Sequence, residues 1–138
     1  MIGILDYGVG NVGAFLRIFH SQNIAAMPIT HPADFEVVDK IILPGVGAFD
    51  SAMIKLNDSG LRETLDYFVT NVKIPILGVC IGMHMLGSYS EEGSSQGLGY
   101  IHGHTKKFPV TNLNESILLP HMGWNNIIIR NQESIWTD

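Results

Sequence analysis

One cysteine is the most nucleophilic side chain in this sequence, and it lies at a predicted junction between a strand and a helix. Cys80 ends the apolar run 75–79, and Gly78 and Gly82 flank it. A strained turn at such a junction needs small neighbours, and the free N–H groups of the following helix stabilise a thiolate. A lone cysteine is more commonly a small buried hydrophobe. The segment alone therefore leaves two interpretations open, a catalytic nucleophile and a core residue.

The composition bounds the kind of protein that carries this cysteine. The chain has 138 residues, of which 46% are hydrophobic, and this is enough for one globular domain with a proper core. Its formal charge is -5, and the basic residues are scattered apart from the adjacent Lys106 and Lys107. This balance argues against a nucleic-acid partner and favours a small molecule or another protein.

Cysteine and histidine usage indicates the cellular setting. A single cysteine excludes an internal disulfide framework, which favours a reducing cytoplasm. The N-terminus lacks a basic segment, and no apolar run approaches the length of a membrane span, so we predict a cytoplasmic protein without a membrane partner. His102 and His104 are two positions apart, but the histidines form no recognisable ligand set. We predict neither a metal nor a cofactor.

Short apolar runs alternate with amphipathic segments through the first part of the chain. Asp58 or Ser59 is expected to cap the third helix. Because the strands are apolar on both sides, they predict an α/β fold with three layers, in which helices cover a mostly parallel sheet. The predicted strands are 2–5, 24–29, 37–43 and 75–80, and the predicted helices are 12–19, 48–56, 61–72 and one that begins after Cys80.

Three glycine-bearing loops leave the carboxyl ends of the predicted strands, at 6–11, 44–47 and 80–82. In open parallel sheets the ligand crevice forms beyond these ends, so the three loops are predicted to face one site. The first loop lacks the third glycine of a dinucleotide-binding fingerprint. We therefore do not expect it to bind a phosphate.

The pattern changes after Ser88. Residues 90–97 form a polar loop, and shorter alternating runs then predict antiparallel strands that extend one edge of the sheet. The last residues, 133–138, offer neither a helix cap nor a closing strand, so residues 1–138 are expected to form a single domain that is incomplete at its C-terminal end. The predicted antiparallel strands are 98–101, 105–108, 116–119 and 125–130.

Five short strings along the chain together resemble the class I (triad) glutamine amidotransferases. They occur in the order of that family and cover nearly the whole chain. More narrowly, they resemble the glutaminase subunits of imidazole glycerol phosphate synthases, which act in histidine biosynthesis. The resemblance implies a flavodoxin-like fold. The strings are DYGVGN at 6–11, LPGVGAF at 43–49, GVCIGM at 78–83, GLG at 97–99 and PHMGWN at 120–125.

The resemblance also implies roles for individual residues. Cys80 would attack the side-chain amide of glutamine, form a glutamyl thioester and release ammonia. The oxyanion would be bound by the backbone N–H of Ile81 and by that of Val46 or Gly47, and losing one such donor typically costs about 10²–10³ in rate. Substrate contacts are implied for Gly45, His84 and Glu92, of which Glu92 would hold the α-amino group.

A partner subunit is implied by the same resemblance. Asn11, His121 and Trp124 would face a cyclase subunit, to which the ammonia travels, so the active assembly would be a heterodimer. A tryptophan in such a segment can also anchor a core. Gly123 and Asn125 indicate an exposed turn and favour the interface.

Two departures from the family pattern bear on activity. His84 stands where the family usually has Gln, four positions after the cysteine, and it shares a helix face with Cys80. We interpret it as a polar contact rather than as the base. The base histidine and its orienting glutamate belong to a His-x-Pro-Glu segment, which these 138 residues do not contain. The chain by itself is therefore expected to be inactive.

Three alternatives remain open at this point. One is a paralogous amidotransferase subunit that aminates a sugar of a surface polysaccharide. Another is a non-catalytic remnant that binds a cyclase-like partner through Asn11 and Trp124. The third is a hydrolase or peptidase of the same sheet type, which would use Cys80 with His84 or His121 as base.

Overall fold

The structure is a computed structural model that describes residues 1–108, 123–126 and 128. It divides into two compact units, Met1–Lys107 and Phe108–Asp138. In the second unit the described residues belong to no helix or strand. The predicted strand 116–119 lies outside the described residues, and so do 127, 129 and 130 of the predicted strand 125–130.

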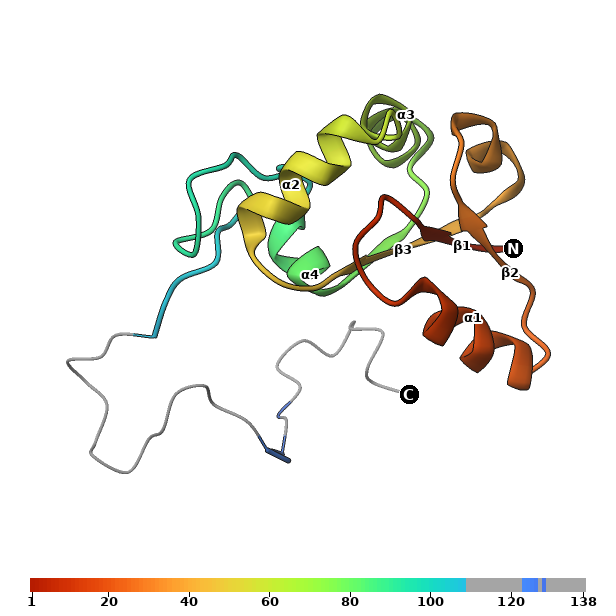
Figure 1. Ribbon diagram of the computed structural model, residues 1–138, viewed down its shortest axis with the longest axis horizontal. Helices are drawn as coiled ribbons and strands as arrows, with labels where there is room; N and C mark the ends of the chain where they lie inside the picture. The colour runs from red at the N-terminus through yellow and green to blue at the C-terminus, as the bar shows by residue number, and fades with distance from the viewer. Residues whose placement is uncertain (109–122, 127, 129–138) are drawn as a thin grey trace. The chain divides into compact units, whose positions relative to one another are not determined.

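The first unit is built on a parallel sheet of four strands (Figure 1). Each strand pairs in parallel with its neighbours, in the order β2-β1-β3-β4. This confirms the predicted α/β fold with a parallel sheet. The strands are β1 (Ile2–Leu5), β2 (Ala26–Ile29), β3 (Lys40–Gly45) and β4 (Ile76–Cys80).

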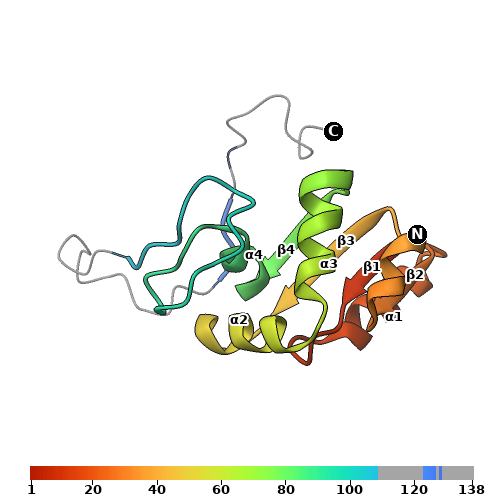
Figure 2. The same ribbon diagram turned by 90° about the horizontal axis from the view of Figure 1, so that it is seen from above.

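Helices lie on both faces of the sheet. Figure 1 shows α1 on one face and α2 and α3 on the other, and Figure 2 shows the same layers from above. The predicted three-layer arrangement is thus present. The helices are α1 (Val12–Ser21), α2 (Phe49–Asp58), α3 (Arg62–Tyr67), the π-helical turn η2 (Phe68–Val72) that continues it, α4 (Ile81–Leu86) and the 3₁₀ helix η1 (Pro32–Val37).

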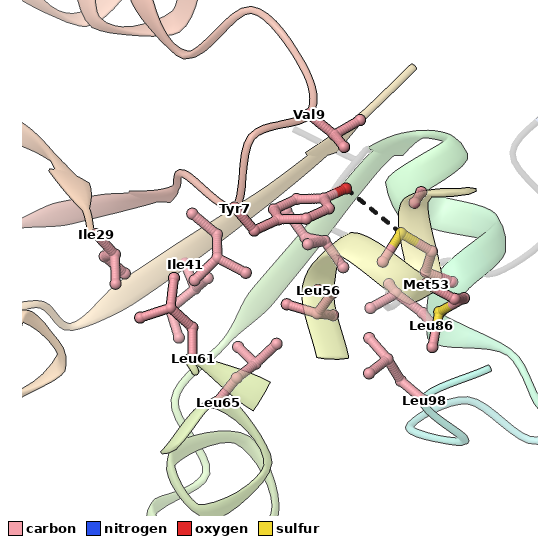
Figure 3. Packing of buried hydrophobic residues seen from close by; sticks show 14 of the residues in the cluster. Tyr7, Val9, Ile29, Ile41, Met53, Leu56, Leu61, Leu65, Leu86 and Leu98 are labelled. Carbon is pink, nitrogen blue, oxygen red and sulfur yellow. Dashed lines mark hydrogen bonds between the residues drawn. The ribbon is translucent and has the colours of Figure 1, made fainter. Parts of the chain in front are cut away.

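The main hydrophobic core lies between the sheet and the helices α2, α3 and α4. Leu5 and Leu43 point from the sheet into this core, and they meet Phe49 of α2 and Leu65 of α3. All four side chains are fully buried. Figure 3 shows part of this cluster, with Leu56, Leu61 and Leu65 close together.

Two predicted strands begin later than expected. Strand β3 starts at Lys40 rather than at 37 because η1 occupies 32–37, where the Asp34 carboxylate accepts the backbone N–H groups of Thr30 and His31, each at 2.8 Å. Strand β2 starts at Ala26 because the N–H of Ile24 closes the end of α1 through the Phe19 carbonyl at 2.9 Å.

The third helix also differs from its prediction at both ends. Asp58 belongs to α2, and the Ser59 hydroxyl accepts the N–H of Leu61 at 3.1 Å, ahead of the first residue of α3. Val72, the last residue of the predicted helix, is 49% exposed. The π-helical turn η2 changes the angular spacing of side chains and rotates Val72 away from the core.

The predicted antiparallel strands at 98–101 and 105–108 are wrong. In this region the described residues form only isolated bridges, antiparallel between Tyr89 and Gln96 and parallel between Ser90 and Thr105. The backbone of 98–101 serves another purpose, because its N–H groups bond to the last carbonyls of α4, with Leu98 reaching Met85 at 2.8 Å. These are the carbonyls that a helix end leaves without an intrahelical partner.

Candidate active site

Cys80 ends β4 and is also the N-cap of α4. Its backbone has φ 57° and ψ -122°, a conformation that L residues rarely adopt. Such a conformation costs about 1–3 kcal/mol and persists only where the surroundings enforce it. The side chain is exposed, so the interpretation as a buried core residue is wrong.

Three glycines make this turn possible, because the first turn of α4 lies directly against β3 and β4. A Cβ at Gly82 would lie 2.0 Å from the carbonyl oxygen of Leu43, and one at Gly78 would lie 2.5 Å from the carbonyl oxygen of Gly82. A Cβ at Gly45 would lie 2.4 Å from the backbone N of Gly82. The obstacles are backbone atoms, so no side-chain rotation relieves them.

The loop after β3 starts beside the cysteine. Gly45 is the register partner of Cys80 in the parallel ladder, so Val46 and Gly47 leave the sheet at the level of the thiol. Both residues are exposed, and Gly47 has φ 83°. Ile81 is the first residue of α4, where a backbone N–H has no intrahelical acceptor. The N–H groups with predicted oxyanion roles therefore come from two adjoining strand ends.

The loop after β1 meets the same strand end, as predicted. The Tyr7 hydroxyl donates to the Pro44 carbonyl at 2.7 Å and lies 3.5 Å from the sulfur of Met85, a contact that Figure 3 marks with a dashed line. A Cβ at Gly10 would lie 2.8 Å from Cβ of Pro44. Burial raises the pKa of Tyr7 to about 12. Tyr7 was not singled out from the sequence, although an aromatic residue with a polar end beside a strand terminus is a usable signal.

His84 and Glu92, both predicted substrate contacts, lie side by side. His84 Nδ1 is 3.6 Å from a Glu92 carboxylate oxygen. His84 is one helical turn after Cys80 and lines an open pocket of about 230 Å³ with Met83, His104 and Thr105. Within the described residues, Nδ1 of His84 is buried and makes no hydrogen bond.

The turn that carries Glu92 is fastened by two side chains. The Ser90 hydroxyl accepts the N–H of Glu92 at 3.2 Å, and the Asp50 carboxylate accepts the N–H groups of Ser94 and Ser95, the latter at 2.8 Å. Asp50 was missed from the sequence, where nothing links the start of α2 to a loop more than forty positions later.

The predicted interface residues lie in different parts of the chain. The side chain of Asn11 accepts the N–H of Ala14 at 3.0 Å and so caps α1. Trp124 belongs to the second unit. His121 lies outside the described residues.

Two searches of the described residues bear on metals and membranes. There, no group of three or more His, Cys, Asp and Glu side chains could hold a metal ion. His104 instead stacks on Tyr89, with ring centroids 4.3 Å apart. No helix in the described part of the chain combines the length and the apolar character needed to cross a bilayer.

Comparisons with known proteins agree with this geometry. Residues 4–138 match the family described as Glutamine amidotransferase class-I. The chain is 49% identical over 127 residues to the imidazole glycerol phosphate synthase subunit HisH of Leptospira borgpetersenii, 47% to that of Leptospira interrogans and 45% to that of Bdellovibrio bacteriovorus. Each alignment covers 92% of this chain and 62% of the relative, so the chain spans less than two thirds of the length of these relatives. The chain belongs to the class-I glutamine amidotransferase family.

Proposed function

We propose that this chain is the glutaminase part of an amidotransferase that hydrolyses glutamine to glutamate and ammonia. The observation that carries the proposal is the strained, exposed Cys80, which is paired in register with Gly45 at the start of the Val46–Gly47 loop. A nucleophile beside two sets of backbone N–H donors is the arrangement that acyl transfer requires.

The reaction takes place in two steps. The Cys80 thiolate attacks the side-chain carbonyl carbon of glutamine, and the negative charge moves to the carbonyl oxygen, where the N–H of Ile81 and that of Val46 or Gly47 stabilise it. The C–N bond then breaks, the leaving nitrogen takes a proton from water and departs as ammonia, and a glutamyl thioester remains. Water attacks this thioester, the C–S bond breaks, and glutamate and the Cys80 thiolate are released while the protons of the water pass to solvent.

The residues around the thiol bind the substrate. Gly45 allows the backbone to approach closely, and the Glu92 carboxylate holds the α-ammonium group of glutamine. His84, one helical turn after Cys80, supplies a polar contact. Its distance of 3.6 Å from Glu92 supports a shared role for the two side chains.

We further propose a cyclase subunit as partner and a heterodimer as the working assembly. The relatives named above are subunits of imidazole glycerol phosphate synthase, which supports a role in histidine biosynthesis with ammonia delivered to a cyclase site. Asn11, His121 and Trp124 are the residues that we assign to this interface. The single cysteine supports a cytoplasmic setting.

By itself the 138-residue chain is expected to turn glutamine over very slowly. The base histidine and glutamate that the family resemblance implies are not found in these residues, and losing one member of such a unit lowers turnover by orders of magnitude. The thiol itself remains reactive toward an electrophile.

The test uses a diazoketone analogue of glutamine, which presents an electrophilic carbon where glutamine has its amide. Mass spectrometry of the unaltered chain should show one adduct at Cys80, at a rate that saturates with the analogue and falls when glutamine competes. Cys80→Ser should give no adduct. Labelling that never saturates, or that glutamine does not slow, would contradict the proposal.

A second candidate is a non-catalytic chain that binds a cyclase-like partner. This candidate predicts that complex formation persists in Cys80→Ser and weakens in Trp124→Ala, with no saturable labelling of the unaltered chain.

A further inference from the structure

The carboxylate of Asp50 joins two segments that are distant in the sequence. Asp50 lies in the first turn of α2, and its two oxygens accept the backbone N–H of Ser94 at 3.0 Å each. Oδ1 also accepts the N–H of Ser95 at 2.8 Å, and Oδ2 accepts the Ser94 hydroxyl at 3.2 Å. Three donors from one turn thus converge on a single side chain.

These hydrogen bonds are made to the charged form of the carboxyl group. The N–H groups of Ser94 and Ser95 lower the pKa of Asp50 to about 2. Hydrogen bonds to an ionised acceptor are roughly twice as strong as those between neutral groups. Gly93 lets the turn approach this closely, because a Cβ there would lie 2.2 Å from Oδ1 of Asp50.

Both ends of this connection lead to the proposed site. On one side, Asp50 follows Gly47 by three positions, and the fully buried Phe49 fixes its helix to the core. On the other side, Ser94 follows Glu92 by two positions. Asp50 thereby links the Val46–Gly47 loop to Glu92 through a few residues of chain and the hydrogen bonds to Ser94 and Ser95.

The other backbone anchors of the turn reach Glu91, Glu92 and Gly93. The N–H of Glu91 bonds to the Thr105 carbonyl at 2.9 Å, and Ser90 closes the turn internally. The contact of Glu92 with His84 at 3.6 Å joins side chains only. Beyond Gly93, the N–H groups of Ser94 and Ser95 are held by Asp50, which belongs to α2.

We propose that Asp50 is a positioning residue that sets the distance between the Glu92 carboxylate and the oxyanion-binding loop. This inference rests on the proposed function. A substrate held by its α-ammonium group at Glu92 reaches the thiol with its amide only if these two segments keep a fixed separation. Asp50 touches neither the substrate nor the sulfur, so it acts on recognition rather than on the reactivity of the thiol.

The experiment compares two reagents on the intact chain. The diazoketone analogue of glutamine needs recognition of its α-ammonium group, whereas iodoacetamide alkylates Cys80 without it. Asp50→Ala should raise the half-saturating concentration of the analogue by about tenfold and leave its maximal rate and the iodoacetamide rate unchanged. Asp58→Ala, at the other end of the same helix, is the matched control and should match the unaltered chain.

The conservative variant Asp50→Asn should keep part of the contact and so most of the affinity for the analogue. In Asp50→Asn the remaining oxygen can accept the two N–H groups that Oδ1 accepts, so the half-saturating concentration should rise only by about threefold. If Asp50→Ala does not fold by circular dichroism, Asp50→Asn carries the test alone with this smaller expected rise.

Each contrary result has its own meaning. If all variants have the same half-saturating concentration of the diazoketone analogue, the positioning role is overturned and the proposed function still stands. A slower iodoacetamide reaction in Asp50→Ala also overturns it, because the effect would then reach the thiol itself. Failure of the unaltered chain to show saturable labelling overturns the proposed function together with this inference.

Discussion

The two faces of the sheet differ in how completely they are buried. On the face covered by α2 and α3, Phe49, Leu56 and Leu65 have no exposed surface, and Leu43 joins them from the sheet. On the face covered by α1, the helix has no buried residue, and Leu77 of β4 is 48% exposed. An open groove of about 720 Å³ also runs between α1 and β2.

The elements that hold the proposed site lie on the more completely buried face of the sheet. Cys80 is held through α4 and the Glu92 turn through α2, and both helices belong to the well-packed face. A site of fixed geometry needs support from side chains that cannot move. Helix α1, in contrast, contributes no residue to this hydrophobic cluster.

The test with the largest expected effect on stability removes one large side chain from each face of the sheet. Phe49→Ala should lower the free energy of unfolding by about 3–5 kcal/mol, because it removes a fully buried ring and leaves a cavity. Leu77→Ala, the matched variant on the α1 face, should cost ~1 kcal/mol. Urea denaturation of both variants measures the two values, and equal losses would refute the comparison.

A second test uses two glycines in equivalent helix positions on opposite faces. Gly82 and Gly13 are each the second residue of their helix. Gly82→Ala should destabilise by about 1–3 kcal/mol, since its Cβ would meet the carbonyl oxygen of Leu43 at 2.0 Å. A Cβ at Gly13 would have no contact closer than 3.6 Å, so Gly13→Ala should raise the free energy of unfolding by ~0.5 kcal/mol. Thermal unfolding distinguishes them, and a neutral Gly82→Ala would mean that the strand and helix can separate freely.

The third and smallest test concerns a single hydrogen bond on the buried face. Tyr7→Phe should cost about 1–2 kcal/mol, because the Pro44 carbonyl loses the donor at 2.7 Å. The control is Tyr67→Phe, which removes the hydroxyl of an exposed side chain of α3 and should change the free energy of unfolding little. Chemical denaturation at neutral pH gives both values.

The same tyrosine predicts a pH dependence. Because the folded-state pKa of Tyr7 is raised to about 12 from its ordinary value near 10, its stabilisation is complete below pH 10 and is lost as the pH rises toward 12. Burial and the hydrogen bond to Asp66 raise the pKa of Tyr100 as well, so it acts in the same direction. Stability should therefore fall less steeply above pH 10 in Tyr7→Phe, and an unchanged slope would contradict this account.

Local patterns suffice to predict the four parallel strands, two of which begin later than predicted, and the tight turn at Cys80. Strand β1 has its predicted bounds because Ile2 to Leu5 is an apolar run that Asp6 ends. The glycines that flank Cys80 likewise indicate a crowded turn from the sequence alone.

Contacts between distant segments could not be predicted in this way. Tyr7 and Asp50 bond to partners 37 and 44 positions away, and no periodicity records such a pairing. Residues 98–101 alternate like a strand, yet their N–H groups satisfy the end of α4 instead. The sequence pattern shows which side chains are apolar, whereas the acceptor that a backbone N–H reaches depends on the tertiary arrangement.

Helix α4 is held at both of its ends, and this has a mechanical consequence. It has six residues, about 9 Å in length, with its first turn wedged against the strands at Gly82 and its last carbonyls tied to 98–101. Because its first turn and its last carbonyls are both held, the N-cap position that carries the Cys80 thiol is fixed from two directions.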